Sequence, residues 1–449
     1  MNDNNEQQLR VEICDSLDHV DGSCWNRLEI EGNPFLRYEF LLALEKTGCL
    51  GKGTGWYPRY FLIRRADIDS LSDASDDTVD DTVGENADDE DNTTTNATEN
   101  TPPAGEDLIA ACACYIKTNS FGEFVFDWAW ADAYERHGLD YYPKLVGAIP
   151  FTPASGPRLL VKPGEQSQLL KALLGKAVLA YCREEGFSSM HWLFLTEQDH
   201  DQLVSEEHLS RLDCQYHWQN DNYTSFDDFL SKCNSKRRKT IRRERRYVSD
   251  ANLRLERRLG STLTAHEWEL VHKYYCTTFD KKWGNPSLTL AFFEQIGQQF
   301  GDNCLIVFAY STGVDPIAVS VMFFGETTLY GRYWGVAENH HCLHFEACYY
   351  QGIEFAIERK LQRFEPGAQG EHKITRGFEP VMTYSAHWLA DAGFRGAIEN
   401  YLAQERPLIR ERRQGLEQHL PFRMDTGVAE DNSDGATAQS DKVQEDSLD

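Results

Sequence analysis

The segment RFEPGAQGEHKITRGF, residues 363–378, places five ionisable side chains after its first residue, Arg363, and among three glycines. These side chains are Glu365, Glu371, His372, Lys373 and Arg376. Burying several charges together costs more free energy than packing returns, so a hydrophobic core does not favour this mixture. A site that binds an anion and moves a proton does favour it. The alternative interpretation is a solvated loop with turn glycines, because loops are polar.

Composition places this segment in a globular protein, because 41% of the 449 residues are hydrophobic and 12% are aromatic. The formal net charge of -27 is concentrated in two acidic segments, residues 67–107 and 425–449, which together carry -22. The remaining sequence is close to neutral, so the net charge does not indicate the partner of the folded part. Both segments are predicted to be disordered, since they have too few apolar residues to offset their chain entropy.

The sequence predicts strands on both sides of the first acidic segment, YFLIRR before it and LIAACACYIK after it. Residues 67–107 are therefore expected to extend a hairpin loop rather than to mark a domain boundary. The twelve cysteines contain no C-x-x-C pair, and no run of about 18 apolar residues occurs. These features predict a cytoplasmic protein without disulfides or a transmembrane segment.

Two further patterns mark the first half of the chain. NPFLRYEFLLALEKTG predicts a helix with Asn33 as its N-cap. GEFVFDWAW alternates strictly and predicts a strand whose core face carries Phe124, Phe126, Trp128 and Trp130. Glu123 and Asp127 would then lie about 13 Å apart on the wet face, where they could line a groove or simply mark the solvent side.

The run 236–246 contains eight lysines and arginines and one acid, Glu244. Three interpretations are open: a polynucleotide such as tRNA, an anionic substrate or surface, and a plain solvated helix. Interleaved aromatic residues for base stacking are absent from the run, which weakens the first of these.

The second half predicts a strand, two helices, three antiparallel strands, a long central helix and a further strand. This order matches the acyltransferase layout of the GNAT superfamily. In that fold the N-terminus of the central helix, here Asn339 to Glu346, holds the pyrophosphate of coenzyme A, as helix dipoles favour.

The chain as a whole resembles one family, the bacterial peptidoglycan biosynthesis/recognition proteins or predicted N-acyltransferases, which are similar to GNAT and Fem-type aminoacyltransferases. The resemblance covers nearly the whole chain outside the acidic segments. It is carried by NPFLRYEFLLALEKTGCLGKGTGWYPRY, SFGEFVFDWAWADAYERHGLDYYPKL, PFTPASGPRLL, QYHWQNDNYTSFDDFLSKCNSKRRKTIRRER, LYGRYWG, LHFEACYYQGIEFAI and FEPGAQGEHKITRGF.

The resemblance implies two tandem GNAT-like domains of mixed α/β class, residues 1–215 and 216–424, and transfer of an acyl or aminoacyl group to an amine. The segment VAENHHCLHFE has no glycine after Gly335, unlike the pyrophosphate loop of ordinary GNAT enzymes. Acyl-coenzyme A and aminoacyl-tRNA therefore both remain possible donors, and the run 236–246 would bind the tRNA.

Transfer to an amine needs a base, oxyanion donors and cations for a donor phosphate. The candidate catalytic residues are Glu365, Glu371, His372 and Glu346, although Glu346 also has a structural role with the helix dipole. The candidate anion or substrate binders in the second half are Arg332, His344, Lys373 and Arg376. The candidates in the first half are Glu123, Asp127, Tyr142, Lys144 and Arg158, because a cleft between tandem domains is a common ligand position.

A metal site is not predicted, because His340, His341, His344 and Glu346 lack the spacing of known ligand sets. The prediction is an N-acyltransferase whose amine acceptor could be a peptidoglycan precursor. Two alternatives are a tRNA-dependent transferase and a non-catalytic protein that binds cell-wall fragments.

Overall fold

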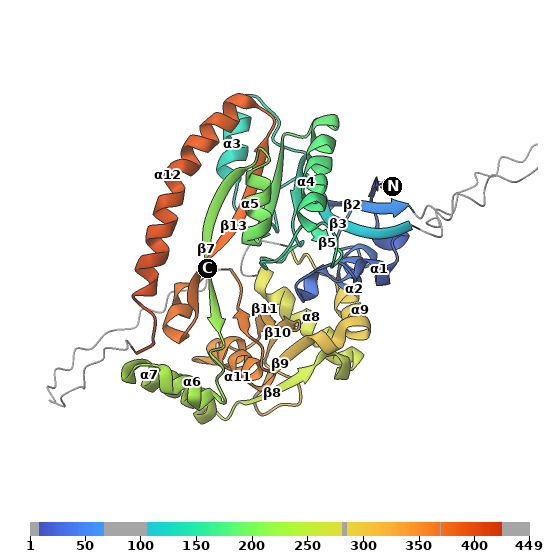
Figure 1. The fold of residues 1–449 in the computed structure, drawn as a ribbon. Helices are drawn as coiled ribbons and strands as arrows, with labels where there is room; N and C mark the ends of the chain where they lie inside the picture. The colour runs from blue at the N-terminus through green and yellow to red at the C-terminus, as the bar shows by residue number, and fades with distance from the viewer. Residues whose placement is uncertain (1–8, 67–105, 281–284, 369, 424–449) are drawn as a thin grey trace, which may run out of the picture.

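The computed structural model describes residues 9–66, 106–280, 285–368 and 370–423 (Figure 1). Their strands form one mixed sheet, which confirms the predicted mixed α/β class. The first half of the chain contributes β1 (Leu9–Cys14), β2 (Trp56–Ala66), β3 (Glu106–Lys117), β4 (Lys144–Gly147), β5 (Leu160–Val161), β6 (Ser189–Leu195) and β7 (Leu209–Gln219). The second half contributes β8 (Arg254–Leu259), β9 (Cys304–Tyr310), β10 (Ala318–Phe324), β11 (Thr328–Val336), β12 (Arg363–Glu365) and β13 (Glu379–Leu389).

The strand order is β1-β2-β3-β4-β6-β13-β7-β12-β11-β10-β9-β8, and β5 pairs with β3. The last strand, β13, lies between β6 and β7 and is antiparallel to both. Strand β7 continues past β13 and pairs with β12, where Phe364 lies opposite Trp218. The two halves therefore share one continuous sheet. The proposed boundary between residues 215 and 216 lies inside β7, and the two-domain division stays a prediction.

Helices cover the sheet in both halves. In the first half these are α1 (Gly22–Trp25), α2 (Tyr38–Lys46), α3 (Trp128–Arg136), α4 (Ser167–Glu184) and α5 (Glu197–Val204). In the second half they are α6 (Phe226–Lys232), α7 (Ser235–Asp250), α8 (Ala265–Asp280), α9 (Leu290–Phe300) and α12 (Ala392–Glu417). The central helix is continuous through α10 (Leu343–Phe345), a π turn (Glu346–Tyr350) and α11 (Gln351–Glu358). Figure 1 shows α12 lying along β7 and β13, which it contacts.

The second-half element order confirms the layout predicted from the sequence. The predicted hairpin is also confirmed, because β2 and β3 are antiparallel neighbours and Ala66 pairs with Glu106. Disorder was predicted for residues 67–107 and 425–449. Residues 67–105 and all of 425–449 lie outside the described residues, whereas Glu106 and Asp107 belong to β3.

The N-terminal helices pack against the second half of the chain. Phe40 of α2 meets Phe292 of α9 with ring centroids 5.6 Å apart, and Phe35 meets Tyr330 at 5.1 Å. Asn33 caps a short 3-10 turn, Pro34–Leu36, and α2 begins only at Tyr38, later than predicted. These contacts bury aromatic surface between the halves and so hold them together.

The strand predicted over residues 123–130 is wrong. Residues 121–127 form an irregular segment, and α3 begins at Trp128. The predicted faces are also largely reversed: Phe124, Phe126 and Trp128 are exposed, whereas Glu123 and Asp127 are buried. Of the four predicted core aromatics only Trp130 is buried. The physical reason is Lys144, which binds both carboxylates and draws them inward.

Candidate functional site

Buried charged side chains gather at the point where two parallel strands stop pairing, which we call the crevice. Strands β11 and β12 pair only from Thr328 opposite Arg363 to Tyr330 opposite Glu365. Pro366 follows directly and has no N–H with which to continue the ladder. The carboxyl ends of parallel strands, at a change in strand direction, are a common position for ligands.

A β-bulge directs Arg332 at this crevice. Val321 of β10 pairs with Tyr333 and Met322 pairs with Gly331, so Arg332 is left without a partner across the strands. Bulges are frequent next to active sites because they re-aim a side chain. The guanidinium lies 4.8 Å from the ring centroid of Phe35, and Nη1 donates to the Gly331 carbonyl at 2.9 Å. Its Nε and Nη2 are buried and have no hydrogen-bond partner.

Glu365 is the most unusual group in the crevice. It is 1% exposed, and neither carboxylate oxygen accepts a hydrogen bond. Arg363 Nε lies 3.2 Å from Oε1 without hydrogen-bond geometry, and His217 Nε2 lies 3.9 Å from Oε2. Leaving a buried carboxylate without donors is costly, so these oxygens are suited to accept a proton or hydrogen bonds from a ligand.

Lys373 adds a second cation to the crevice. It is 3% exposed, and its Nζ donates one hydrogen bond, to the Gly367 carbonyl at 2.9 Å. Burial, together with the charge of Arg332, lowers the pKa of Lys373 to about 7. Its ammonium therefore changes charge near neutral pH.

His217 of β7 lies beside Glu365, and it was not among the site residues predicted from the sequence. Its Nε2 lies 3.3 Å from Gln215 Oε1. Burial lowers the pKa of His217 to about 4, although Glu365 opposes this shift. The available signal was the alternation of Gln215 and His217 in QYHWQ, which places two polar side chains on one face of β7.

A second group of predicted residues gathers at the N-terminus of the central helix. His372 Nε2 lies 2.9 Å from the Tyr349 hydroxyl, and the Arg376 guanidinium lies 3.4 Å from the Phe345 ring centroid. Burial lowers the pKa of His344 to about 3 and that of His372 to about 4, with contributions from Lys373 and Arg376. Neutral imidazoles and cations beside helix amides are suited to binding an anion.

Helix α7 holds the central helix in place. Arg245 binds both oxygens of Glu346 at 3.0 Å and also binds Glu354 at 2.6 Å. Glu244 accepts two hydrogen bonds from Arg376, at 2.7 and 3.2 Å. Glu346 is thus held in a bidentate ion pair, which favours its structural role over that of a base.

Glu371 lies apart from Glu365. Its side chain is 59% exposed and binds Arg412 of α12 at 2.9 Å. The five candidate residues of this segment are therefore divided: Glu365 and Lys373 lie in the crevice, His372 and Arg376 lie at the helix, and Glu371 lies at the surface.

The first-half candidates form a separate buried cluster. Lys144 Nζ lies 2.8 Å from Glu123 Oε2 and also bonds to Asp127 and to Ser120 Oγ, the latter at 2.9 Å. Tyr142 reaches the same cluster through Ser120, at 2.8 Å. Lys144 binds one oxygen of each carboxylate, whereas Glu123 Oε1 and Asp127 Oδ1 are buried without a hydrogen-bond partner. The pairing of these buried charges is the arrangement of a structural ion-pair network.

Arg158 is also satisfied within the protein. Its guanidinium donates to the carbonyls of Ala154, Gly156, Pro157 and Leu193 at 2.7 to 3.2 Å. Burial lowers its pKa to about 10. Four carbonyl acceptors use most of its donors, so its placement favours a structural role.

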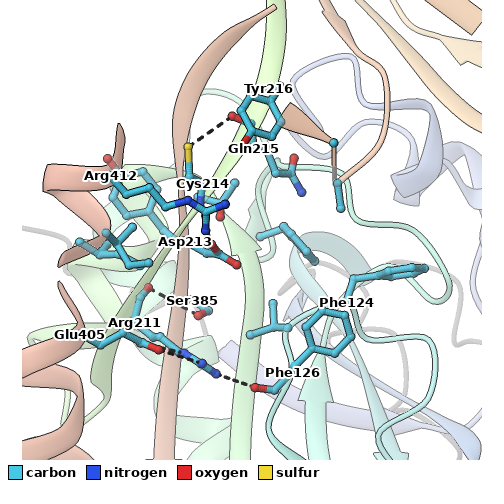
Figure 2. A pocket seen from close by; sticks show the side chains of 18 of the residues that line it. Phe124, Phe126, Arg211, Asp213, Cys214, Gln215, Tyr216, Ser385, Glu405 and Arg412 are labelled. Atoms are coloured by element: carbon cyan, nitrogen blue, oxygen red, sulfur yellow. Dashed lines mark hydrogen bonds and ion pairs between the residues drawn. The ribbon is translucent and has the colours of Figure 1, made fainter. Parts of the chain in front are cut away.

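A groove of about 400 Å³ lies beside the crevice (Figure 2). Its lining includes Gln215 of β7 and residues 368, 370 and 371 of the segment that follows Glu365. Because Gln215 contacts His217, which lies next to Glu365, a polar path leads from the groove to the buried carboxylate.

Within the described ranges, no group of three or more His, Cys, Asp or Glu residues could hold a metal ion. Among the described residues, no helix is both long enough and apolar enough to span a membrane.

The comparison with known proteins decides the family. The model of a FemAB-like family, described as peptidoglycan biosynthesis/recognition, matches residues 16–79 and 92–424. The chain belongs to this FemAB-like family. The family resemblance predicted from the sequence is thereby confirmed. No curated protein is significantly similar to the chain.

Solved structures resemble this FemAB-like chain at low sequence identity. A structure of FemX shares 8% identity, covers 87% of this chain and 100% of its own, and has a TM-score of 0.48. A tandem GNAT protein from the clavulanic acid biosynthesis pathway shares 8% identity over 86% of this chain and 99% of its own, with a TM-score of 0.39. L-PGS from Bacillus licheniformis shares 8% identity over 66% and 86%, with a TM-score of 0.42. At these TM-scores the likenesses carry no argument about the reaction.

Proposed function

We propose that the protein is an N-acyltransferase that moves an acyl or aminoacyl group from an activated donor to an amine, with its centre in the crevice between β11 and β12. The observation that carries the proposal is Glu365, a buried carboxylate whose two oxygens accept no hydrogen bond. Its charge acts on Arg332, whose Nε and Nη2 are unused donors. The family, described as peptidoglycan biosynthesis/recognition, supports a cell-wall precursor as the acceptor.

The crevice supplies the parts that direct transfer requires. Glu365 takes a proton from the attacking amine as the new C–N bond forms. Arg332 donates hydrogen bonds to the oxyanion that develops on the donor carbonyl. The bond to the donor's thiolate or ribose oxygen then breaks, and the proton lost by nitrogen balances the proton that this leaving group gains.

The donor phosphate is assigned to the N-terminus of the central helix. His344 and His372 lie there, and the charge of Lys373 acts on both of them and is itself close to Arg332. Arg376 lies beside them but is already paired with Glu244, so Lys373 is the cation assigned to the phosphate. Both candidate donors carry phosphate: acyl-coenzyme A carries it at the far end of the pantetheine arm, and aminoacyl-tRNA carries it next to the acylated ribose. The first experiment is calorimetry of acetyl-coenzyme A and of a mixed aminoacyl-tRNA pool with the purified protein. Binding of neither would contradict the transferase and favour the non-catalytic binding protein.

The charge of Lys373 gives a pH-dependent prediction. The pKa of about 7 means that its ammonium is mostly charged at pH 6 and mostly neutral at pH 8. We expect donor affinity to fall by up to roughly tenfold as pH rises over that interval, as the charged fraction does. The measurement is calorimetric Kd against pH. Lys373→Arg should flatten the profile because arginine stays charged, and an unchanged profile in that variant would contradict the assignment.

Helix α7 favours the tRNA-dependent version of this reaction. Its buried face consists of Ile241, Glu244 and Val248, whereas Lys236, Lys239, Arg243 and Arg246 lie at helical spacing with partly or fully exposed side chains. Among the described residues, Lys239 and Arg243 make no ion pair. Free cations on one helix face are suited to phosphates of a polynucleotide.

Neutralising this face tests the tRNA version. The double variant Lys239→Gln with Arg243→Gln should lower the salt slope of tRNA binding by about one for each lost phosphate contact. The matched control is Lys52→Gln with Lys176→Gln, which removes the same charge from exposed positions elsewhere. Equal effects of the two double variants on tRNA binding would show that only net charge matters, and would exclude α7 from the tRNA-binding site.

A further inference from the structure

The groove of Figure 2 has an aromatic wall and a polar floor. The wall is formed by Phe124 and Phe126, and the floor by β7 and β13. In the figure, Asp213 and Gln215 point from β7 toward the side on which the two rings lie. Helix α12 closes the other side with Glu405, Ile409 and Arg412.

The aromatic wall is held rigidly in solvent. Phe124 is 38% exposed and Phe126 is 54% exposed, whereas Glu123 and Asp127, next to them, are anchored below by Lys144. Phe124 has a backbone φ of 61°, and Phe194 at the floor has a φ of 55°. Such left-handed conformations are rare and costly for bulky residues and cluster at ligand sites.

The polar side chains of the floor favour a ligand with many hydroxyl groups. Arg211, Asp213, Gln215, Thr383 and Ser385 all line the groove, on adjacent strands. Arg211, Gln215 and Ser385 are already bonded to Glu405, Pro153 and His387, so Asp213 and Thr383 offer the polar atoms that a ligand's hydroxyl groups would meet. The floor is the face of a sheet and not an edge, so a peptide backbone cannot bind by adding a strand.

The charges of the groove exclude an anionic ligand. Arg211 binds both oxygens of Glu405 at 3.1 Å, and Arg412 binds Glu371 at 2.9 Å. Both arginines in the lining are thus already paired with a carboxylate. Asp213 makes no ion pair among the described residues, and the lining has more acidic than basic side chains. A cationic group beside Asp213 and the aromatic rings would be favoured.

We propose that this groove binds a saccharide that carries a free amino group. The sugar's apolar face would stack on Phe124 and Phe126, its hydroxyls would bond to the floor, and its ammonium would lie beside Asp213. The assignment of the groove as the acceptor subsite rests on the proposed transfer function. The assignment of the groove as a saccharide-binding site does not. Gln215, which lines the groove, contacts His217, and His217 lies 3.9 Å from Glu365, so the groove adjoins the proposed reaction centre.

The test is calorimetry of three probes with the whole protein: a trimer of glucosamine, its fully N-acetylated form and maltotriose. The glucosamine trimer should bind at least tenfold more tightly than the other two. Phe126→Ala and Asp213→Asn should each weaken it by at least tenfold. The matched control is Phe121→Ala, which removes a 68% exposed ring of the same loop that does not line the groove.

Equal binding of the three trimers, or an unchanged affinity in Asp213→Asn, would overturn the proposal. Equally tight binding of trilysine would also overturn the proposal, because the groove would then recognise the ammonium group and not the sugar. Glu365→Gln should keep full affinity for the glucosamine trimer. Loss of transfer with retained binding therefore separates the reaction centre from the groove, and failure of either proposal can be recognised without the other.

Discussion

Replacing Glu365 by glutamine is expected to lower the rate of acyl transfer by about two to four orders of magnitude, because the amide has the shape of the acid but cannot take a proton. The protein should stay folded. Neither oxygen of Glu365 accepts a hydrogen bond, so the change breaks none. It does remove the ion pair with Arg363, but that side chain is 38% exposed and water can solvate its charge. The measurement is a single-turnover rate with whichever donor binds in calorimetry, together with the Tm of both proteins.

The segment 363–378 provides a matched control. Glu371→Gln makes the same chemical change six residues away, on a side chain that is 59% exposed and paired with Arg412. We expect a change in transfer rate of less than about threefold, because exposed ion pairs contribute little free energy. If Glu365→Gln retains transfer and Glu371→Gln loses it, Glu371 at the surface is the base. That result would contradict the assignment of the crevice as the reaction centre.

The division of this segment shows what its sequence could and could not predict. A mixture of acids, cations and glycines predicts a site, and the backbone does take positive φ values at Gly367, Gly370 and Gly377. Each such turn reverses the direction in which the following side chain points. The mixture of acids, cations and glycines therefore predicted that a site lies in this segment. It could not predict that Glu365 and Lys373 face inward while Glu371 faces solvent.

Local periodicity explains why the second-half elements were predicted correctly. Strand β9 is a continuous apolar run buried throughout, and β10 is buried on both faces. The position of β13 between β6 and β7 was not predictable, because strand pairing over such sequence separation leaves no local pattern. His217 was missed for the same reason: it becomes a crevice residue only when β7 crosses to β12.

Residues 123–130 show how an alternating pattern can mislead. The period of two was read as a strand with its aromatics inside. Lys144 supplies a buried charge that two carboxylates must neutralise, and that requirement outweighs the preference of phenylalanine for the core. The sequence carries no signal for this choice, because Lys144 is distant in the chain and reads as an ordinary first residue of a strand.

Lys144→Met should produce the largest loss of stability, about 3–5 kcal/mol in the free energy of unfolding, because it leaves two buried carboxylates without a cation. Lys144 is 0% exposed, and Glu123 and Asp127 are each 3% exposed. Urea unfolding at pH 7 measures the loss. The triple variant that also carries Glu123→Gln and Asp127→Asn should recover most of it, since every charge of the network is then removed.

The pH dependence of that loss separates the electrostatic cause from simple repacking. In the wild type, burial raises the pKa of Asp127, but Lys144 and His191 outweigh it and hold the pKa at about 2. This pKa lies below the ordinary value of 3.8, so the contribution of Asp127 is present above pH 3.8 and is lost as pH falls toward 2. Burial already raises the pKa of Glu123 to about 7 in the wild type. Without Lys144, burial raises the pKa of Asp127 as well, so the folded variant binds a proton that the unfolded chain releases. The stability of Lys144→Met should therefore rise relative to wild type as pH falls from 7 to 5, and a loss that stays constant over this interval would assign it to packing instead.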